Sequence, residues 1–147
     1  MASRLRHLRA RALKAAFNAH TAIYEASDGR LGSHIGMPML LLTVTGRKSG
    51  QPRSTPLVYF EADGAYVVVG SDGGARRDPQ WWSNLQVDPR GKVRVGRRVL
   101  DVEAHLAENE ERARLWAQSQ GVNPAWERYQ KTTERSLPVV VLKPTQS

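Results

Sequence analysis

Short apolar runs separated by turn residues extend from position 39 to position 142. The predicted strands among them have four to seven residues, whereas helices usually need about ten or more. Asp63-Gly64 joins the second and third runs and is typical of a tight hairpin turn. We therefore predict a mostly antiparallel sheet of about six strands, with the first three paired in series. The predicted strands are 39–45, 55–61, 65–71, 92–95, 99–105 and 138–142.

Helix signals occur between these strands and after them. Pro79 suits the first position of a helix that ends at Asp88-Pro89. A later segment has acidic residues in its first turn and is followed by Gly121, which is typical of a helix C-terminus. The pattern indicates an α+β fold with short flanking helices. The predicted helices are 79–87, 108–120 and 124–132.

The N-terminal segment 3–24 has apolar residues near helical spacing and predicts an amphipathic basic helix. Two interpretations stay open for it. Its basic side chains are solvated while its apolar face packs on the rest of the fold, or the helix makes a peripheral contact with a membrane surface. The basic positions are Arg4, Arg6, Arg9, Arg11 and Lys14.

The length of 147 residues and the 40% hydrophobic content suffice for one buried core. We expect a single domain, with the basic helix and a loop in 1–30 and the core of the fold in 37–144. The longest apolar run, 37–44, is far shorter than the roughly 20 residues that span a bilayer. Since the basic N-terminus also lacks the apolar core of a signal peptide, we expect a cytoplasmic protein, with membrane association as the alternative.

The chain has 22 Lys and Arg against 14 Asp and Glu, a net charge of +8, and a pI near 10.4. This excess favours polyanionic partners: nucleic acid, anionic lipid or a phosphorylated cofactor. The absence of cysteine excludes disulfides, thiolate nucleophiles and Cys-ligated metals, so redox chemistry would need a bound organic cofactor. The four histidines are widely spaced and form no metal-binding or catalytic-triad pattern.

A basic loop, residues 45–53, joins the first two predicted strands. Its glycines let backbone N–H groups approach a ligand closely. Arg47 and Arg53 can bind phosphate or carboxylate oxygens in a bidentate manner, and Lys48 adds a mobile charge. The spacing is not that of a Walker loop. Composition leaves two interpretations open, an anion-binding cradle or a solvated hairpin turn.

A second loop, 71–77, also leaves a strand, is rich in small residues, and leads into the helix after Pro79. Small residues let a flat ring lie against the backbone, and a helix N-terminus favours negative charge. The two loops could therefore flank one ligand. Trp81 and Trp82 occupy adjacent helical positions that face different sides, so at least one of them is expected in the core.

An ordered set of motifs supports a more specific interpretation. The motifs are 41–53 (LLTVTGRKSGQPR), Thr55-Pro56-Leu57, Gly74-Ala75, 79–85 (PQWWSNL), 99–101 and 137–141. In these segments the chain resembles the deazaflavin-dependent nitroreductases of the actinobacterial type. The resemblance implies a split β-barrel that binds coenzyme F420, and an oxidoreductase that transfers a hydride from the reduced coenzyme to an electron-poor acceptor. That acceptor is a quinone, a nitroaromatic compound or an activated alkene.

The resemblance also implies the positions that hold the coenzyme. Those in the basic loop match the contacts to its phosphate and oligoglutamate tail, and the others lie in segments around the coenzyme. The implied coenzyme-binding residues are Arg47, Lys48, Ser49, Gly50, Arg53, Pro56, Ser71, Gly74, Ala75, Trp81 and Asn84.

The acceptor side departs from the family pattern. Only Tyr129 remains where the best-known members carry a tyrosine cluster, and position 58 is Val where some members have Tyr. We expect Val58, Trp126 and Tyr129 to line the acceptor site. Tyr129 or Ser71 is expected to act as the catalytic residue, by a hydrogen bond to the acceptor's carbonyl or nitro group. Reduction of nitroimidazoles does not follow from the resemblance.

Other interpretations remain beside this one. An FMN-binding split-barrel reductase would use the basic loop for the FMN phosphate, and a non-catalytic coenzyme carrier would keep only the binding site. A basic nucleic-acid-binding barrel needs aromatic residues interleaved with Lys and Arg on exposed strands, whereas the predicted strands are apolar and the cations lie in loops. We expect a small-molecule acceptor and no nucleic-acid partner. A homodimer is expected by fold analogy alone.

Overall fold

The computed structural model describes residues 37–145. The predicted helix and loop of 1–30, with the membrane contact suggested for them, lie outside the described residues. The described strands are β1 (Met39–Thr45), β2 (Pro52–Val58), β3 (Phe60–Ala62), β4 (Ala65–Val69), β5 (Arg90–Val95), β6 (Arg98–Leu106) and β7 (Val139–Pro144). The helices are the short 3-10 helix η1 (Asp72–Gly74), α3 (Gln80–Val87), α4 (Asn109–Ser119) and α5 (Ala125–Lys131).

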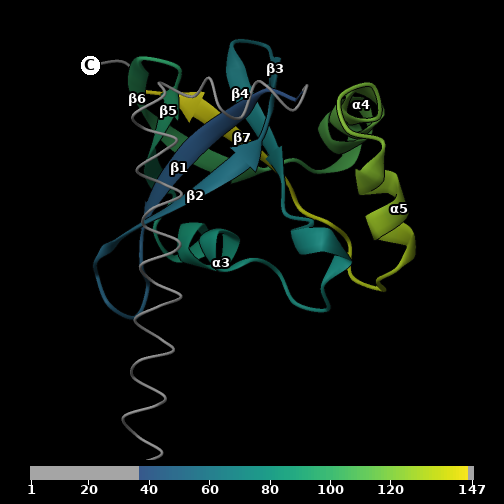
Figure 1. Ribbon diagram of the computed structural model, residues 1–147, viewed down its shortest axis with the longest axis horizontal. Helices are drawn as coiled ribbons and strands as arrows, with labels where there is room; N and C mark the ends of the chain where they lie inside the picture. The colour runs from purple at the N-terminus through teal and green to yellow at the C-terminus, as the bar shows by residue number, and fades with distance from the viewer. Residues whose placement is uncertain (1–36, 146–147) are drawn as a thin grey trace, which may run out of the picture.

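The seven strands form one sheet in the order β2-β1-β5-β6-β7-β4-β3, and all neighbouring strands are antiparallel. The two edge strands, β2 and β3, are separated in sequence by Tyr59 alone. Because one residue cannot cross a flat sheet, the sheet curls until its two edges approach each other, as Figure 1 shows. This curled sheet confirms the predicted α+β split barrel, with seven strands instead of about six.

The prediction of a single strand over 55–61, paired in series between its neighbours, is wrong. β2 pairs with the whole of β1, from Pro52 opposite Thr45 to Val58 opposite Met39. From Phe60 onward the chain pairs with β4 at the other edge, where Phe60 lies opposite Val67. Because the chain pairs with β1 up to Val58 and with β4 from Phe60, it forms two short strands where the sequence predicts one.

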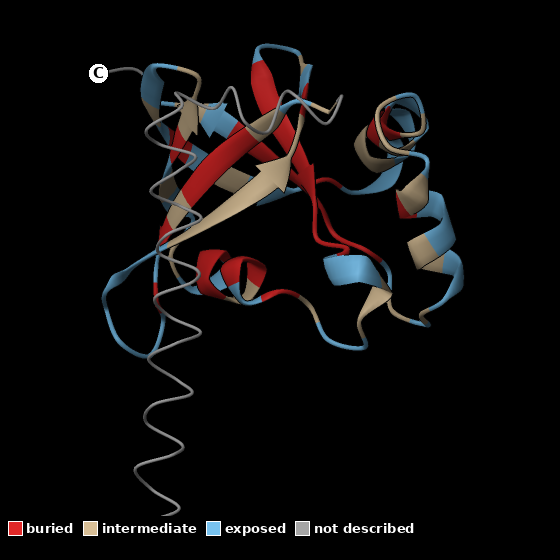
Figure 2. Ribbon diagram, viewed as in Figure 1, coloured by how far each residue is buried: buried red, intermediate tan, exposed pale blue. Residues whose placement is uncertain are grey.

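Two hydrophobic clusters lie on opposite faces of the sheet. Successive residues of a strand point to opposite faces, so β4 and the apolar residues 139–142 of β7 contribute to both clusters. Val68 and Val140 point into the barrel cluster, whereas Val67 and Val141 point into the outer cluster. Figure 2 shows this burial along β1, β4 and β7.

The helices complete the two clusters. α3 adds Trp81, Trp82 and Leu85 to the barrel cluster, and α4 and α5 add Leu115 and Trp126 to the outer one. In Figure 1, α3 lies beneath the barrel and α4 and α5 lie together to one side. All three helices occur where the sequence predicts them. Within residues 37–145, no helix has both the length and the apolar character needed to cross a bilayer.

Candidate functional site

The connection between β1 and β2 is a closed turn that fixes the shape of the basic loop. The N–H of Gly46 donates to the carbonyl of Gln51 at 2.8 Å, and the N–H of Gly50 donates to the carbonyl of Gly46 at 2.8 Å. Gly50 has φ +70°, a left-handed conformation that favours glycine. A Cβ on Gly46 would lie 2.7 Å from Ser49 Oγ, so a side chain there would displace that hydroxyl.

Arg47 is attached to α3 by two hydrogen bonds to one atom. The Oδ1 of Asn84 accepts the backbone N–H of Arg47 at 3.1 Å and its Nη1 at 2.8 Å. Asn84 is only 5% exposed, so its amide position is set by the packing of α3. The loop is therefore held against the helix by a buried polar group.

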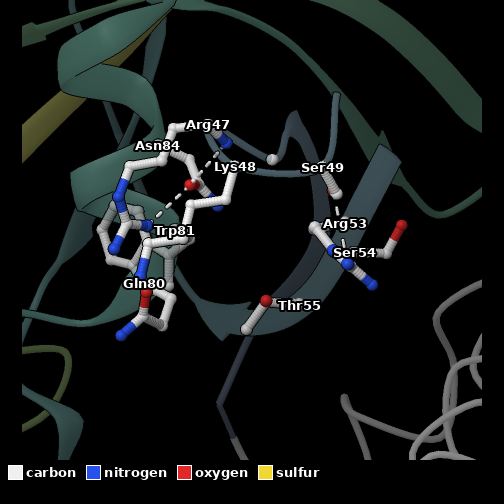
Figure 3. A pocket seen from close by; sticks show the side chains of 10 residues that line it. Arg47, Lys48, Ser49, Arg53, Ser54, Thr55, Gln80, Trp81 and Asn84 are labelled. Atoms are coloured by element: carbon white, nitrogen blue, oxygen red, sulfur yellow. Dashed lines mark hydrogen bonds between the residues drawn. The ribbon is translucent and has the colours of Figure 1, made fainter. Parts of the chain in front are cut away.

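A pocket of about 360 Å³ lies between the basic loop, β2 and α3. Figure 3 shows Arg47 and Asn84 on one side of it and Ser49 with Arg53 on the other. The Nη2 of Arg53 donates to Ser49 Oγ at 3.3 Å, which ties the second guanidinium group to the loop. The residues that line the pocket are Gly46, Arg47, Lys48, Ser49, Arg53, Ser54, Thr55, Gln80, Trp81 and Asn84.

The charge around this pocket is positive. Three of its lining residues, Arg47, Lys48 and Arg53, carry cations, and no lining residue is acidic. α3 begins beside the pocket with no side-chain cap and no acidic residue in its first turn. The unpaired N–H groups of a helix N-terminus add to a positive potential. The arrangement suits a ligand that carries phosphate or carboxylate groups.

The structure gathers six of the eleven predicted coenzyme-binding residues around this pocket and leaves five outside its lining. Gly50 lines a neighbouring hollow with Pro52 and Arg90. The residues inside are Arg47, Lys48, Ser49, Arg53, Trp81 and Asn84; those outside are Gly50, Pro56, Ser71, Gly74 and Ala75. Trp81 has two roles, since it lines the pocket and is also 6% exposed in the barrel cluster.

The predicted ring-contacting residues of the second loop lie on the segment 70–78, which includes η1. A Cβ on Gly74 would collide with Thr132 Oγ1 and would lie 3.1 Å from the carbonyl oxygen of Tyr129. Close packing on α5 therefore explains this glycine without a ligand. Ser71 is 9% exposed, and its side chain makes no capping hydrogen bond to η1.

The three residues predicted to line the acceptor site are distributed differently. Trp126 is 3% exposed and packs in the outer cluster, with its ring centroid 6.3 Å from that of Phe60. Tyr129 and Val58 are half-buried at the edge of the same cluster. Trp126 therefore has a core role, and Tyr129 and Val58 keep part of their surface accessible.

Sequence reasoning missed several residues of the pocket and one residue that binds the 70–78 segment. Gln80, Ser54 and Thr55 line the pocket although only their neighbours were selected. Arg135, which binds the 70–78 segment, stands alone in a polar stretch before the last strand and carries no motif. Nothing in the sequence pattern distinguishes it from a surface arginine. Among residues 37–145, no three potential metal-ligating side chains lie close enough to hold an ion.

Comparisons with known proteins agree with one another. Residues 16–144 match the model of a family described as F420H(2)-dependent quinone reductase. An F420H(2)-dependent quinone reductase of Mycobacterium tuberculosis is 41% identical over 129 residues, which cover 84% of this chain and 86% of the relative. A solved structure described as an F420-H2 dependent reductase (FDR-A) is 37% identical, with TM-score 0.67, and covers 72% of this chain and 94% of that one. Another solved structure, described as a domain-swapped dimer, is 37% identical, with TM-score 0.68, and covers 72% of this chain and 80% of that one.

Proposed function

Because this chain belongs to the F420H(2)-dependent quinone reductase family, we propose that its basic loop, β2 and α3 form the site that holds the anionic part of coenzyme F420. The activity follows the family: reduced F420 is the hydride donor and a quinone is the acceptor. The observation that carries the site assignment is a pocket with three cationic side chains and no acidic one.

The cationic side chains of the pocket and the fixed position of Arg47 both suit the anionic groups of the coenzyme. Guanidinium groups bind phosphate and carboxylate in a bidentate manner, and the ammonium of Lys48 adds a third charge. Asn84 already holds Arg47 in the structure, so less conformational entropy is lost when an anion binds. Trp81 lines the same pocket and is buried, so it gives the exposed cations an apolar wall beside them.

When bound, the reduced deazaflavin supplies a hydride to the quinone ring. The residues of this chain bind the two reactants and orient them at about 3–3.5 Å. We propose Ser71 and Tyr129 as hydrogen-bond donors to the quinone oxygen on which negative charge develops. Two observations support these roles. Ser71 is 9% exposed and its hydroxyl does not cap η1. Tyr129 lies on α5, which packs against the 70–78 segment at Gly74.

The activity is tested by following anaerobic oxidation of reduced F420 with menadione as the quinone probe. We expect quinone-dependent oxidation that is saturable in both reactants and far faster than the reaction without protein. Reduced FMN, offered at the same concentration, should be a poor donor. A rate equal to the protein-free rate with several quinones would overturn the assignment, and faster oxidation of reduced FMN would move the chain to the flavin-dependent alternative.

The described residues give little support to a nucleic-acid-binding barrel. Such a barrel needs exposed aromatic rings as stacking platforms. Trp81, Trp82 and Trp126 are each less than 8% exposed, and Trp116 is half-buried with the Arg112 guanidinium 5.5 Å from its ring centroid. The FMN alternative fits the same cations, but family membership favours the deazaflavin.

Self-association is a separate proposal. A solved structure 37% identical to this chain is described as a domain-swapped dimer. We expect this chain to form a homodimer as well, which light scattering after size-exclusion chromatography would show as twice the 16.4 kDa monomer mass. A monomer mass at micromolar concentrations would remove the dimer from the account.

A further inference from the structure

Arg135 makes an unusual concentration of hydrogen bonds to a single segment. Its Nε donates to the carbonyl of Ala75 at 2.7 Å, and its Nη2 donates to the carbonyl of Ser71 at 2.8 Å. Its Nη1 donates to the carbonyl of Gly70 at 3.0 Å and to Asp78 Oδ1 at 2.9 Å. Four of the five N–H donors of one guanidinium group are therefore directed at residues 70–78. The side chain is only 14% exposed.

The 70–78 segment needs such a partner because it is irregular. It leaves β4, passes through η1 and reaches α3 without joining the sheet, so its carbonyl groups have few partners in regular structure. Carbonyls removed from water without a hydrogen bond destabilise the fold. One planar guanidinium group satisfies three of them at once, which a lysine ammonium cannot do with the same geometry.

The backbone around Arg135 is itself held by hydrogen bonds. Arg135 lies between α5 and β7, and Gln130 of α5 bonds the backbone at Arg135 and just after it. Gln130 Nε2 donates to the carbonyl of Arg135 at 2.8 Å, and the N–H of Leu137 donates to Gln130 Oε1 at 2.9 Å. The N–H of Gly70 donates to the carbonyl of Pro138 at 2.8 Å. Figure 1 shows the chain before β7 running beside η1.

These contacts reach the candidate coenzyme pocket through α3. Asp78, the acidic partner of Arg135, immediately precedes Pro79, from which α3 begins. The first turn of α3 and the turn after it supply Gln80, Trp81 and Asn84 to the pocket wall. The position of that wall therefore depends on the position of the 70–78 segment, which ends directly before Pro79 and α3.

We propose that Arg135 is a positioning residue for the coenzyme site: it fixes the 70–78 segment and the start of α3, so that one wall of the pocket is formed before the coenzyme binds. The identity of the ligand in this proposal rests on the proposed function. Arg135 itself lies outside the pocket lining and acts through Asp78 and the backbone of its neighbours.

Hydrogen exchange of the full-length protein without coenzyme tests the first half of the proposal. In Arg135→Ala, amides of 70–84 should exchange at least about tenfold faster, since several hydrogen bonds of ordinary strength are lost. Arg135→Lys should give a smaller increase and serves as the measured variant if Arg135→Ala does not fold. Two controls are Arg114→Ala, which removes an exposed cation, and Leu115→Ala, which destabilises the outer cluster; neither should change exchange in 70–84 selectively.

Coenzyme binding and turnover test the second half. In Arg135→Ala we expect the Kd of F420 to rise about tenfold, and kcat at saturating reduced F420 to fall no further than in Ser71→Ala, because the released segment carries Ser71. Millimolar methylguanidinium should restore both exchange protection and affinity. Methylammonium at the same ionic strength should not, since it lacks the planar set of donors.

Exchange in 70–84 that is unchanged in both Arg135 variants would overturn the proposal, and so would faster exchange with an unchanged Kd. If the wild-type protein itself fails to bind F420, the proposed function fails, while the exchange data still decide whether Arg135 holds this segment. If Leu115→Ala lost as much affinity for F420 as Arg135→Ala, the loss would reflect lower overall stability and would also contradict the positioning role.

Discussion

Asn84 projects from the buried side of α3, and its Oδ1 accepts hydrogen bonds from both the backbone and the guanidinium group of Arg47. The sequence resemblance implies both residues as coenzyme contacts. The structure adds that they bind each other, across 37 positions of sequence. Arg47 and Asn84 therefore each have a partner within the protein as well as a proposed contact with the coenzyme.

Asn84→Ala should weaken the binding of F420 by about tenfold, because the variant removes the acceptor that holds a charged donor in place. The turnover number at saturating coenzyme should change little, since the ring end of the coenzyme is untouched. Fluorescence titration with F420 and steady-state kinetics measure the two effects. Ser83→Ala, one position away and outside the pocket lining, is the matched control; an equal loss in that variant would contradict the role of Asn84.

Tyr129→Phe and Ser71→Ala separate the two proposed donors to the quinone. Loss of a hydrogen bond that strengthens in the transition state lowers kcat, on the order of tenfold or more. We expect this lower kcat for one of the two variants at least. In Tyr129→Phe, which changes no implied coenzyme-binding residue, the Kd of F420 should stay unchanged. Full turnover in both single variants and in the double variant would remove these residues from catalysis.

At the scale of elements, the strands β2 and β3 show what local pattern can and cannot predict. Val58, Tyr59 and Phe60 are all strand-forming residues, so nothing local marks the place where the chain exchanges one sheet edge for the other. The helices were predictable because Pro79, Gly121 and the acids of the first turn of α4 are local signals. Strand pairing depends on the whole sheet, so the order of the strands did not follow from the sequence.

Tyr59 lies at this junction and provides a pH test of it. Burial, followed by the nearby Glu61 and Tyr66, raises the pKa of the Tyr59 phenol. A raised folded-state pKa favours the protonated form, so its contribution to stability is complete below the unfolded pKa of about 10 and is lost as the pH rises through the folded value.

We therefore expect the free energy of unfolding to fall above about pH 10, and to fall less steeply in Tyr59→Phe. Urea denaturation of both proteins between about pH 8 and 11 measures the two slopes. The comparison with Tyr59→Phe isolates this phenol from the other tyrosines and from the lysines. Parallel pH dependence in the two proteins would contradict the burial of a titrating group at the junction.

At the scale of the whole molecule, the two clusters support different parts of the fold. The barrel cluster carries α3 and the pocket, whereas the outer cluster joins β4 and β7 to α4 and α5. The cationic half of the site could be predicted because it lies in one contiguous loop, residues 45–53. Arg135 could not, since its role comes from neighbours 57 to 65 positions away. The family resemblance also suggested Trp126 as a wall of the acceptor site, whereas its side chain is buried in the outer cluster, and the local sequence does not reveal that burial.

Trp126→Ala should lower the free energy of unfolding by about 3–5 kcal/mol, the usual effect of removing a large buried aromatic side chain. At 25 °C the KM for the quinone should change little, because the ring packs against Phe60 in the outer cluster. Denaturation and steady-state kinetics on one preparation measure both. A raised KM with unchanged stability would instead support Trp126 as a wall of the acceptor site.

The central claim is that the basic loop and α3 hold F420, and equilibrium titration with F420 and FMN tests it most directly. We expect selective binding of F420 by the wild-type protein, weakened about a hundredfold when Arg47→Ala and Lys48→Ala are combined, since two charge-assisted contacts are lost. Arg114→Ala combined with Lys143→Ala removes the same net charge from exposed positions outside the pocket and should bind F420 nearly as the wild type does. Equal loss in the two double variants would show a general charge effect, and binding of FMN in preference to F420 would contradict the account.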